Sequence, residues 1–146
     1  MARYSIGALS AGAGSTTLPL LSIYSAAAVA PTVREVGVFN TTATGVAVKL
    51  VRLSTTGTQG AGLAAANKYN PDSAAASTSG FQTHTVAPTT TDAGYRAQLG
   101  AAIGSGVIWT FGDLGIRLAV ATTQGLGVMI ENGTGQVCQI YFVFDE

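Results

Sequence analysis

The last third of the chain shows the clearest pattern of apolar and polar positions. An apolar run at 125–132 is followed by Gly133-Thr134-Gly135 and then by a second β-rich run at 136–144. An Asn-Gly step between two such runs is a strong hairpin signal, so we predict a β-hairpin here. In the second run one set of alternate residues is wholly apolar, and a period of two places their side chains on one face of a sheet. This stripe requires cover from elsewhere in the chain, and it consists of Cys138, Ile140, Phe142 and Phe144.

Apolar runs of strand length recur through the rest of the chain, separated by Gly, Thr, Pro and Asn turns. Residues 33–40 and 46–54 predict two strands that form a second hairpin. Both faces of the run 46–54 are mixed, so its inner face stays open. Residues 95–103 fit either a strand or a short helix. Because no convincing amphipathic helix appears anywhere, the pattern predicts an all-β fold, an antiparallel sandwich or barrel.

The 146 residues are enough for one domain with a real core, so we expect a single domain over residues 1–146. Two segments interrupt the strand pattern. Residues 1–17 predict an N-terminal strand followed by a Gly/Ser/Thr/Ala-rich arm. Residues 55–80 predict one long irregular loop, and such loops in compact domains are usually functional or disordered.

Charge is scarce in this chain. Charged residues make up 10% of the sequence, with seven basic and seven acidic side chains, against about 25% in ordinary globular proteins. No basic patch is present, so we expect no nucleic-acid partner. Charge-poor, neutral surfaces tend to associate, which favours a component of an assembly. The alternative is a soluble monomer whose surface is kept in water by Ser, Thr and Gly.

Neither a membrane span nor a secretion signal is expected. No stretch approaches the roughly 18 apolar residues that a span needs. The segment 18–30 superficially resembles a signal peptide, but only Arg3 provides a basic residue ahead of it and Pro31 follows the candidate cleavage site. Cys138 is the only cysteine, so no internal disulfide forms, and its place on the apolar stripe predicts a buried structural thiol.

Residues for catalysis or metal binding are nearly absent. His84 is the only histidine, and among threonines it is most simply a surface or satisfied strand residue. Gly104-Ser105-Gly106 is too short for a nucleophile elbow. Asp72 beside Asn70 is first of all a turn, and one Cys with one His excludes zinc in practice. We therefore predict no enzyme, no cofactor and no catalytic or metal-binding residue. A small hydrolase whose carboxylates converge in the fold remains a third alternative.

The aromatic residues favour a core over a binding platform. They stand in strands at core spacing: Trp109, Phe111, Tyr141, Phe142 and Phe144. A lectin platform requires exposed aromatic rings beside polar groups, and the sequence does not indicate such an arrangement.

The C-terminal region, residues 106–146, resembles a known group of proteins. The motifs are Trp109-Thr110-Phe111-Gly112, Leu114-Gly115-Ile116, the glycine-rich run 125–135 and the terminal Phe142-Val143-Phe144-Asp145-Glu146. They are similar to small virion proteins of tailed bacteriophages, some of which are capsid decoration (cement) proteins with a jelly-roll fold. The resemblance implies a non-enzymatic protein on the capsid exterior, often a trimer, that bridges neighbouring capsomers.

Taken with this resemblance, the sequence predicts a jelly-roll-like β-sandwich that decorates and stabilises a bacteriophage capsid. We expect its partner to be the major capsid protein, and we expect a homo-oligomer, with a trimer favoured. The resemblance further implies that the protein is made in the host cytoplasm and resides on the virion exterior. The arm at 1–17 and the loop at 55–80 are the expected contacts. The alternative function is a carbohydrate- or receptor-binding module of a virion fibre or spike.

Overall fold

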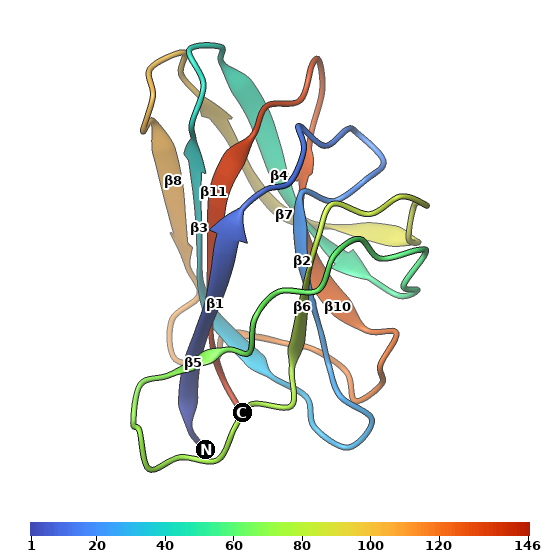
Figure 1. Cartoon of the computed structure of the whole chain (residues 1–146), viewed down its shortest axis with the longest axis vertical. Coiled ribbons are helices and arrows are strands. Elements are labelled where there is room, and N and C mark those ends of the chain that lie inside the picture. Colours follow the sequence, from blue (N-terminus) through green and yellow to red (C-terminus); the bar gives the residue numbers. More distant parts are fainter.

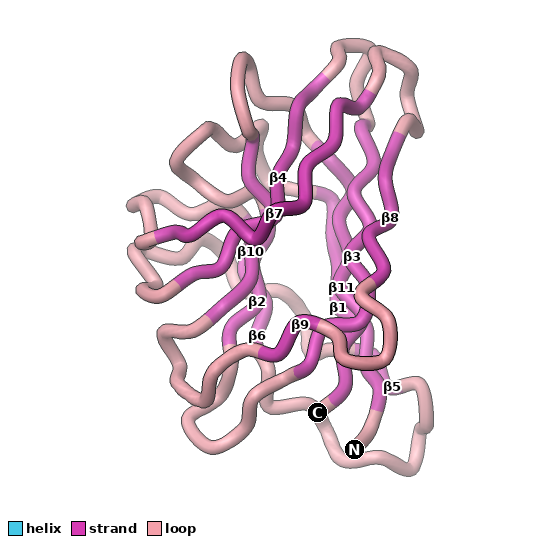
Figure 2. The backbone as a smooth tube through the Cα atoms, turned by 180° about the vertical axis from the view of Figure 1, so that it is seen from behind, coloured by secondary structure: helices cyan, strands magenta, loops and turns pink.

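A computed structural model describes the whole chain, residues 1–146, as two antiparallel sheets that pack face to face, with no helix. Figures 1 and 2 show the two layers from opposite sides. The first sheet runs β5 (Asn67–Lys68), β1 (Arg3–Leu9), β11 (Cys138–Asp145), β3 (Thr32–Asn40) and β8 (Gly106–Thr110), with β9 (Ile116–Arg117) also paired to β3. The second sheet runs β6 (Ser79–Gln82), β2 (Leu21–Tyr24), β10 (Gly125–Ile130), β4 (Val46–Leu53) and β7 (Thr90–Leu99). The predicted all-β antiparallel sandwich is thus confirmed.

The strand order is that of a jelly roll. When the short strands β5, β6 and β9 are set aside, the first strand pairs with the last, the second with the next to last, and so on inward. These antiparallel pairs are β1 with β11, β2 with β10, β3 with β8, and β4 with β7. The chain therefore behaves as one long hairpin rolled into two facing sheets, which is the double Greek-key arrangement.

Both predicted hairpins are wrong. β10 pairs with β2 and β4 in the five-stranded sheet, whereas β11 pairs with β1 and β3 in the six-stranded sheet. Likewise β3 and β4 lie in different sheets. Burial explains the difference, because β10 is buried along its whole length and the inner face of β11 is fully buried. Two such strands side by side would leave their apolar faces on the same side, whereas an arch at 131–137 makes one cover the other.

The core lies between the sheets and contains the predicted stripe of β11. Cys138, Ile140, Phe142 and Phe144 are all fully buried within one cluster of 23 residues. Trp109 is buried as well, but Tyr141 points to the outer face, so its assignment to the core was wrong. The open question about 46–54 is also answered. Val46, Val48 and Leu50 enter the main core, while Val51 and Leu53 belong to a second cluster on the opposite face of the sheet.

The N-terminal segment is half strand and half loop. Arg3–Leu9 forms β1, which lies between β5 and β11 inside the sheet, so only residues 10–17 form a loop. The ambiguous run at 95–103 begins as part of the strand β7 and ends in a turn at 101–104. The predicted N-terminal strand followed by a loop is thus confirmed, and the backbone of β1 is used in the sheet.

The long loop at 55–80 is ordered by contacts with its own chain. It contributes β5 at one edge of the first sheet and runs into β6 at the edge of the second. The Glu146 carboxylate accepts hydrogen bonds from the main-chain N–H of Ser77 (2.6 Å) and Thr78 (3.0 Å) and from the Thr78 hydroxyl (2.7 Å). Tyr4 donates its hydroxyl proton to the carbonyl of Ala74 at 2.9 Å. The order of this loop therefore requires no partner protein.

Candidate binding surface

The outer face of the six-stranded sheet carries a group of apolar and aromatic side chains that remain partly exposed. Strand register aligns Leu9, Gln139, Phe39 and Gly106 in one row, and Gly7, Tyr141, Gly37 and Ile108 in the next. Leu9 and Ile108 are each 50% exposed, and the rings of Phe39 and Tyr141 lie half-buried between them. We call this group of Leu9, Phe39, Ile108 and Tyr141 the outer apolar face. Exposed apolar side chains that gather on one face of a protein commonly mark an interaction site.

Glycines form the floor beneath the two aromatic rings. A Cβ atom on Gly37 would come within 2.1 Å of a ring carbon of Tyr141, so the ring occupies the space above this glycine. The ring of Phe39 occupies the space above Gly106 in the same way, at 2.3 Å. The two rings are stacked, with centroids 6.4 Å apart and an angle of 19° between their planes. The glycines therefore let the aromatic rings lie close to the sheet, which makes the outer face flatter.

The Glu35 carboxylate bonds the tyrosine of this aromatic pair and fixes its ring. The Tyr141 hydroxyl donates to the Glu35 carboxylate at 2.6 Å. Burial, together with the neighbouring Glu35 carboxylate, raises the pKa of Tyr141 to about 12. The tyrosine consequently stays neutral over the physiological pH range and presents a stable, weakly polar surface.

The opposite sheet lacks such a free face, because its outer side is covered by the chain itself. Tyr24, Val51, Leu53 and Met129 point outward from that sheet, yet each is at most 2% exposed. Phe81, in the insertion between β4 and β7, packs against this group, and the Tyr24 hydroxyl donates to the main-chain carbonyl of Thr55. The insertion is closed by a main-chain bond from Ser54 to Thr89 (3.0 Å) and by a bridge between Thr58 and Val86. The large apolar side chains on the outer side of this sheet are thus covered, whereas the six-stranded sheet exposes the outer apolar face.

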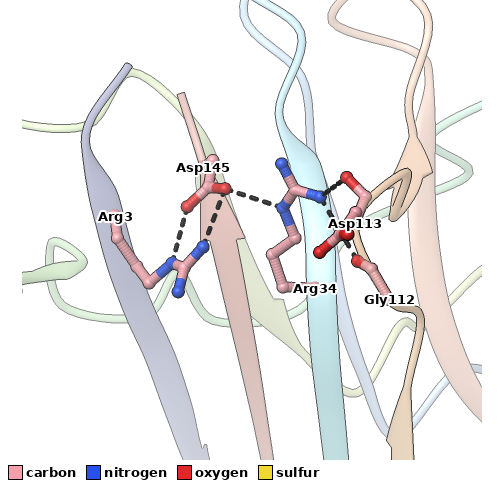
Figure 3. A network of polar contacts seen from close by, with 5 residues as sticks. All are labelled: Arg3, Arg34, Gly112, Asp113 and Asp145. Carbon is pink, nitrogen blue, oxygen red and sulfur yellow. Dashed lines mark hydrogen bonds and ion pairs between the residues drawn. The ribbon is translucent and has the colours of Figure 1, made fainter.

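A polar network fixes the strands that carry the outer apolar face (Figure 3). Asp145, only 7% exposed, accepts hydrogen bonds from Arg3 Nε (2.7 Å), Arg3 Nη2 (3.0 Å) and Arg34 Nε (2.7 Å). Arg34 is the extra residue of a β-bulge in β3, and it also donates to the main-chain carbonyls of Gly112 and Asp113. The hydrogen bond from Arg3 is the main cause that holds the pKa of Asp145 below its usual range. The network therefore joins β1, β11 and β3 to the turn after β8.

His84 is buried, contrary to a surface placement, and is only half satisfied. Its Nε2 lies 2.8 Å from Ser22 Oγ, and both residues are at most 1% exposed. Its Nδ1 has no hydrogen-bond partner, so the carboxylate that orients the base of a Ser-His-Asp triad is missing. Burial lowers the pKa of His84, which keeps the ring neutral. The geometry fits a structural contact that anchors the insertion to β2.

The other residues considered for chemistry are dispersed. Cys138 is fully buried, and burial raises the pKa of its thiol to about 11, as expected for a structural cysteine. Asn70 and Asp72 form a turn in which Asn70 Oδ1 accepts the main-chain N–H of Asp72 at 3.0 Å. The structure brings no three His, Cys, Asp or Glu side chains together as a metal site. The structure contains no helix with the length and apolar character that a membrane span needs.

Sequence reasoning missed the outer apolar face because it favoured the loops. A signal was present in the second alternate set of β11, where Tyr141 and Val143 are apolar or aromatic. The glycines opposite Tyr141 come from β1 and β3, so only the register of three strands reveals the floor. The Arg3–Asp145–Arg34 network left no sequence signal, because its members lie more than 100 positions apart from Asp145.

The fold and this surface define a jelly-roll sandwich with one uncovered apolar face. Comparisons with protein-family models, with curated proteins and with solved structures find no match to the chain.

Proposed function

We propose that this protein is a structural virion protein that decorates a bacteriophage capsid and stabilises it by binding the major capsid protein. The single observation that supports this most is the outer apolar face, which is exposed on one side of the sandwich, whereas the large apolar side chains on the outer side of the other sheet are covered by the chain itself. Jelly rolls are recurrent in viral capsid and lectin domains, which is in keeping with the proposal as an analogy of fold. The resemblance of residues 106–146 to phage decoration proteins supports the same function.

The mechanism is stabilisation by mass action. A protein that binds the assembled shell but not its separated subunits shifts the equilibrium toward the shell. We favour the outer apolar face as the capsid contact over the N-terminal segment and the long loop. The backbone of β1 is already paired on both sides within the sheet, and the long loop is hydrogen-bonded to the Glu146 carboxylate. We expect the free protein to be a homo-oligomer, with a trimer favoured, on the exterior of the virion.

The test is co-sedimentation with capsids assembled from the major capsid protein that the same genome encodes. Wild-type protein should pellet with capsids, and binding should change little between about 0.05 and about 0.5 M salt, because few charges take part. Ile108→Lys and Leu9→Lys introduce charge on the outer apolar face at half-exposed positions and should abolish binding. The matched control is Val86→Lys, because Val86 is 55% exposed and lies in the insertion between β4 and β7, where it forms a bridge with Thr58.

Three outcomes would contradict the proposal: no binding of the wild type, a steep loss of binding at moderate salt, or full binding by the Ile108→Lys variant. Size-exclusion chromatography with light scattering measures the oligomer separately. Binding to glycans or receptors without any binding to capsids would favour the fibre or spike module instead. A hydrolase would require activity that His84→Ala or an Asp→Asn change removes.

A further inference from the structure

A pocket of about 420 Å³ opens beside the edge of the five-stranded sheet, where β2 and β6 lie next to each other. Four separate segments build it: residues 24–27, 56–59, 77–81 and Thr122. Five of its ten lining residues are Ser or Thr, a sixth is Gln59, and none is charged. The volume falls within the range of small-molecule sites, about 300–1,000 Å³.

The pocket places one half-buried aromatic ring near an unsatisfied hydroxyl. Phe81 lines the pocket and packs edge to face against Tyr24, which is only 2% exposed, with ring centroids 6.0 Å apart. Ser25, also in the lining, is only 4% exposed, and its Oγ has no hydrogen-bond partner in the protein. A buried polar group without a partner is uncommon in native structures and calls for a water molecule or a ligand.

The walls of the pocket are held in place before any ligand arrives. The segment containing Ser77 is fixed by the Glu146 carboxylate, which accepts the Ser77 N–H at 2.6 Å. The Tyr24 hydroxyl donates to the carbonyl of Thr55 at 3.3 Å, which fixes the ring and the neighbouring Thr56 segment. Such preorganisation lowers the entropy lost on binding.

We propose that this pocket binds a neutral saccharide ring. Hydroxyl and amide side chains both donate and accept hydrogen bonds, as sugar hydroxyls require, and the half-buried ring of Phe81 accommodates the apolar C–H face of a pyranose. The absence of charge in the lining disfavours phosphates, nucleotides and acidic sugars. An extended peptide fits less well, because the outer edge of β6 already pairs with the chain itself. The main-chain N–H of Leu63 donates to the Gly80 carbonyl and that of Gln82 to the Ala61 carbonyl, both at 2.8 Å. The site is independent of the proposed capsid contact, which lies on the other sheet.

The experiment is a titration of ¹⁵N-labelled full-length protein, followed by two-dimensional NMR. The probes are methyl glucoside, methyl galactoside and N-acetylglucosamine, with glucuronate as the charged comparison. At least one neutral sugar should give saturable shifts at the amides of residues 24–27, 56–59 and 77–81. For a ligand of this size the dissociation constant should be on the order of 1 mM. Glucuronate should bind more weakly.

Gln59→Ala removes one side-chain partner and should weaken binding between about threefold and about tenfold, the effect of one hydrogen bond. Gln139→Ala is the matched control, because Gln139 is exposed on the outer face of the other sheet and should leave the affinity unchanged. Ser79→Ala serves as a second variant should Gln59→Ala disturb the spectrum elsewhere.

The proposal is overturned if no neutral sugar gives saturable shifts in the pocket, if glucuronate binds as tightly, or if both pocket variants keep the wild-type affinity. Capsid co-sedimentation of the pocket variants tests the proposed capsid function separately from sugar binding.

Discussion

Replacement of Asp145 by Asn tests whether the network of Figure 3 stabilises the sandwich. The amide is nearly isosteric with the carboxylate, but it removes the negative charge that faces Arg3 and Arg34. The Arg3 side chain is 49% exposed, so its bond contributes at most about 1 kcal/mol, as for surface ion pairs. The Arg34 side chain is 22% exposed, and a charge-assisted bond in such a setting contributes about 1.5–3 kcal/mol. The expected loss of unfolding free energy at pH 7 is therefore about 3 kcal/mol.

Urea unfolding measures this loss as a lower midpoint at an unchanged slope. Thermal unfolding should show a decrease in Tm of roughly 10 °C for a chain of this size. Asp113→Asn is the matched control, because Arg34 bonds the main-chain carbonyl of Asp113 and the carboxylate itself is exposed. This variant should differ from the wild type by no more than about 0.5 kcal/mol.

The pH dependence of the same variant has a definite sign. The pKa of Asp145 in the folded protein lies below its usual range. Its stabilising contribution is therefore complete above the unfolded-state pKa of about 3.9 and is lost as the pH falls through the folded-state pKa. The difference between wild type and Asp145→Asn should consequently shrink in acid. A loss below about 1 kcal/mol at pH 7, or a difference that persists undiminished below the folded-state pKa, would refute this account of the network.

Four further predictions concern single sites. Phe142→Ala should cost about 3–5 kcal/mol in urea unfolding, because the ring is fully buried, and an effect near that of Gln139→Ala would contradict the core assignment. Burial opposes ionisation of the Glu146 carboxyl, but hydrogen bonds from Thr78 and Ser77 outweigh this effect and lower its pKa. Glu146→Ala removes the acceptor of these bonds, so it should speed hydrogen exchange of the main-chain amides at residues 77–78 about tenfold or more. In the wild type this protection should be lost as the pH falls below about 4.3 and through the folded-state pKa of Glu146. If Glu146→Ala leaves the exchange rates unchanged, the Glu146 carboxylate does not hold this segment. Because burial lowers the pKa of His84, the unfolding free energy of the wild type should fall as the pH drops below about 6.5, and His84→Gln should lack this sensitivity. Gly37→Ala should displace the Tyr141 ring, so an ultraviolet titration should show the pKa of Tyr141 moving from about 12 toward about 10, whereas an unchanged titration would show that the ring does not depend on the glycine.

Alternation along individual strands was readable from sequence because it is a local property. The apolar stripe of β11 was predicted residue by residue, and the all-β class followed from the strand and turn pattern. Cys138 was likewise placed correctly, since its neighbours on the stripe require a buried position. The proposed capsid function rests on resemblance and on the outer apolar face, and it stays a proposal until binding is measured.

The pairing of strands was a different matter, because a turn reverses the chain without specifying the backbone that will lie beside it. The Asn132-Gly133 step predicts the turn of a hairpin, and Gly133 does adopt a positive φ of 70°. In the structure this turn belongs to an arch that connects the two sheets. The outer apolar face has the same origin, since its glycine floor and aromatic rings come from β1, β3, β8 and β11. The sequence alone determined the all-β class and which side of β11 is apolar, because those properties depend on neighbours in the chain. Only the tertiary structure decided which strands pair, where Arg34 meets Asp145 and which sheet face stays uncovered, because these depend on contacts between residues far apart in sequence.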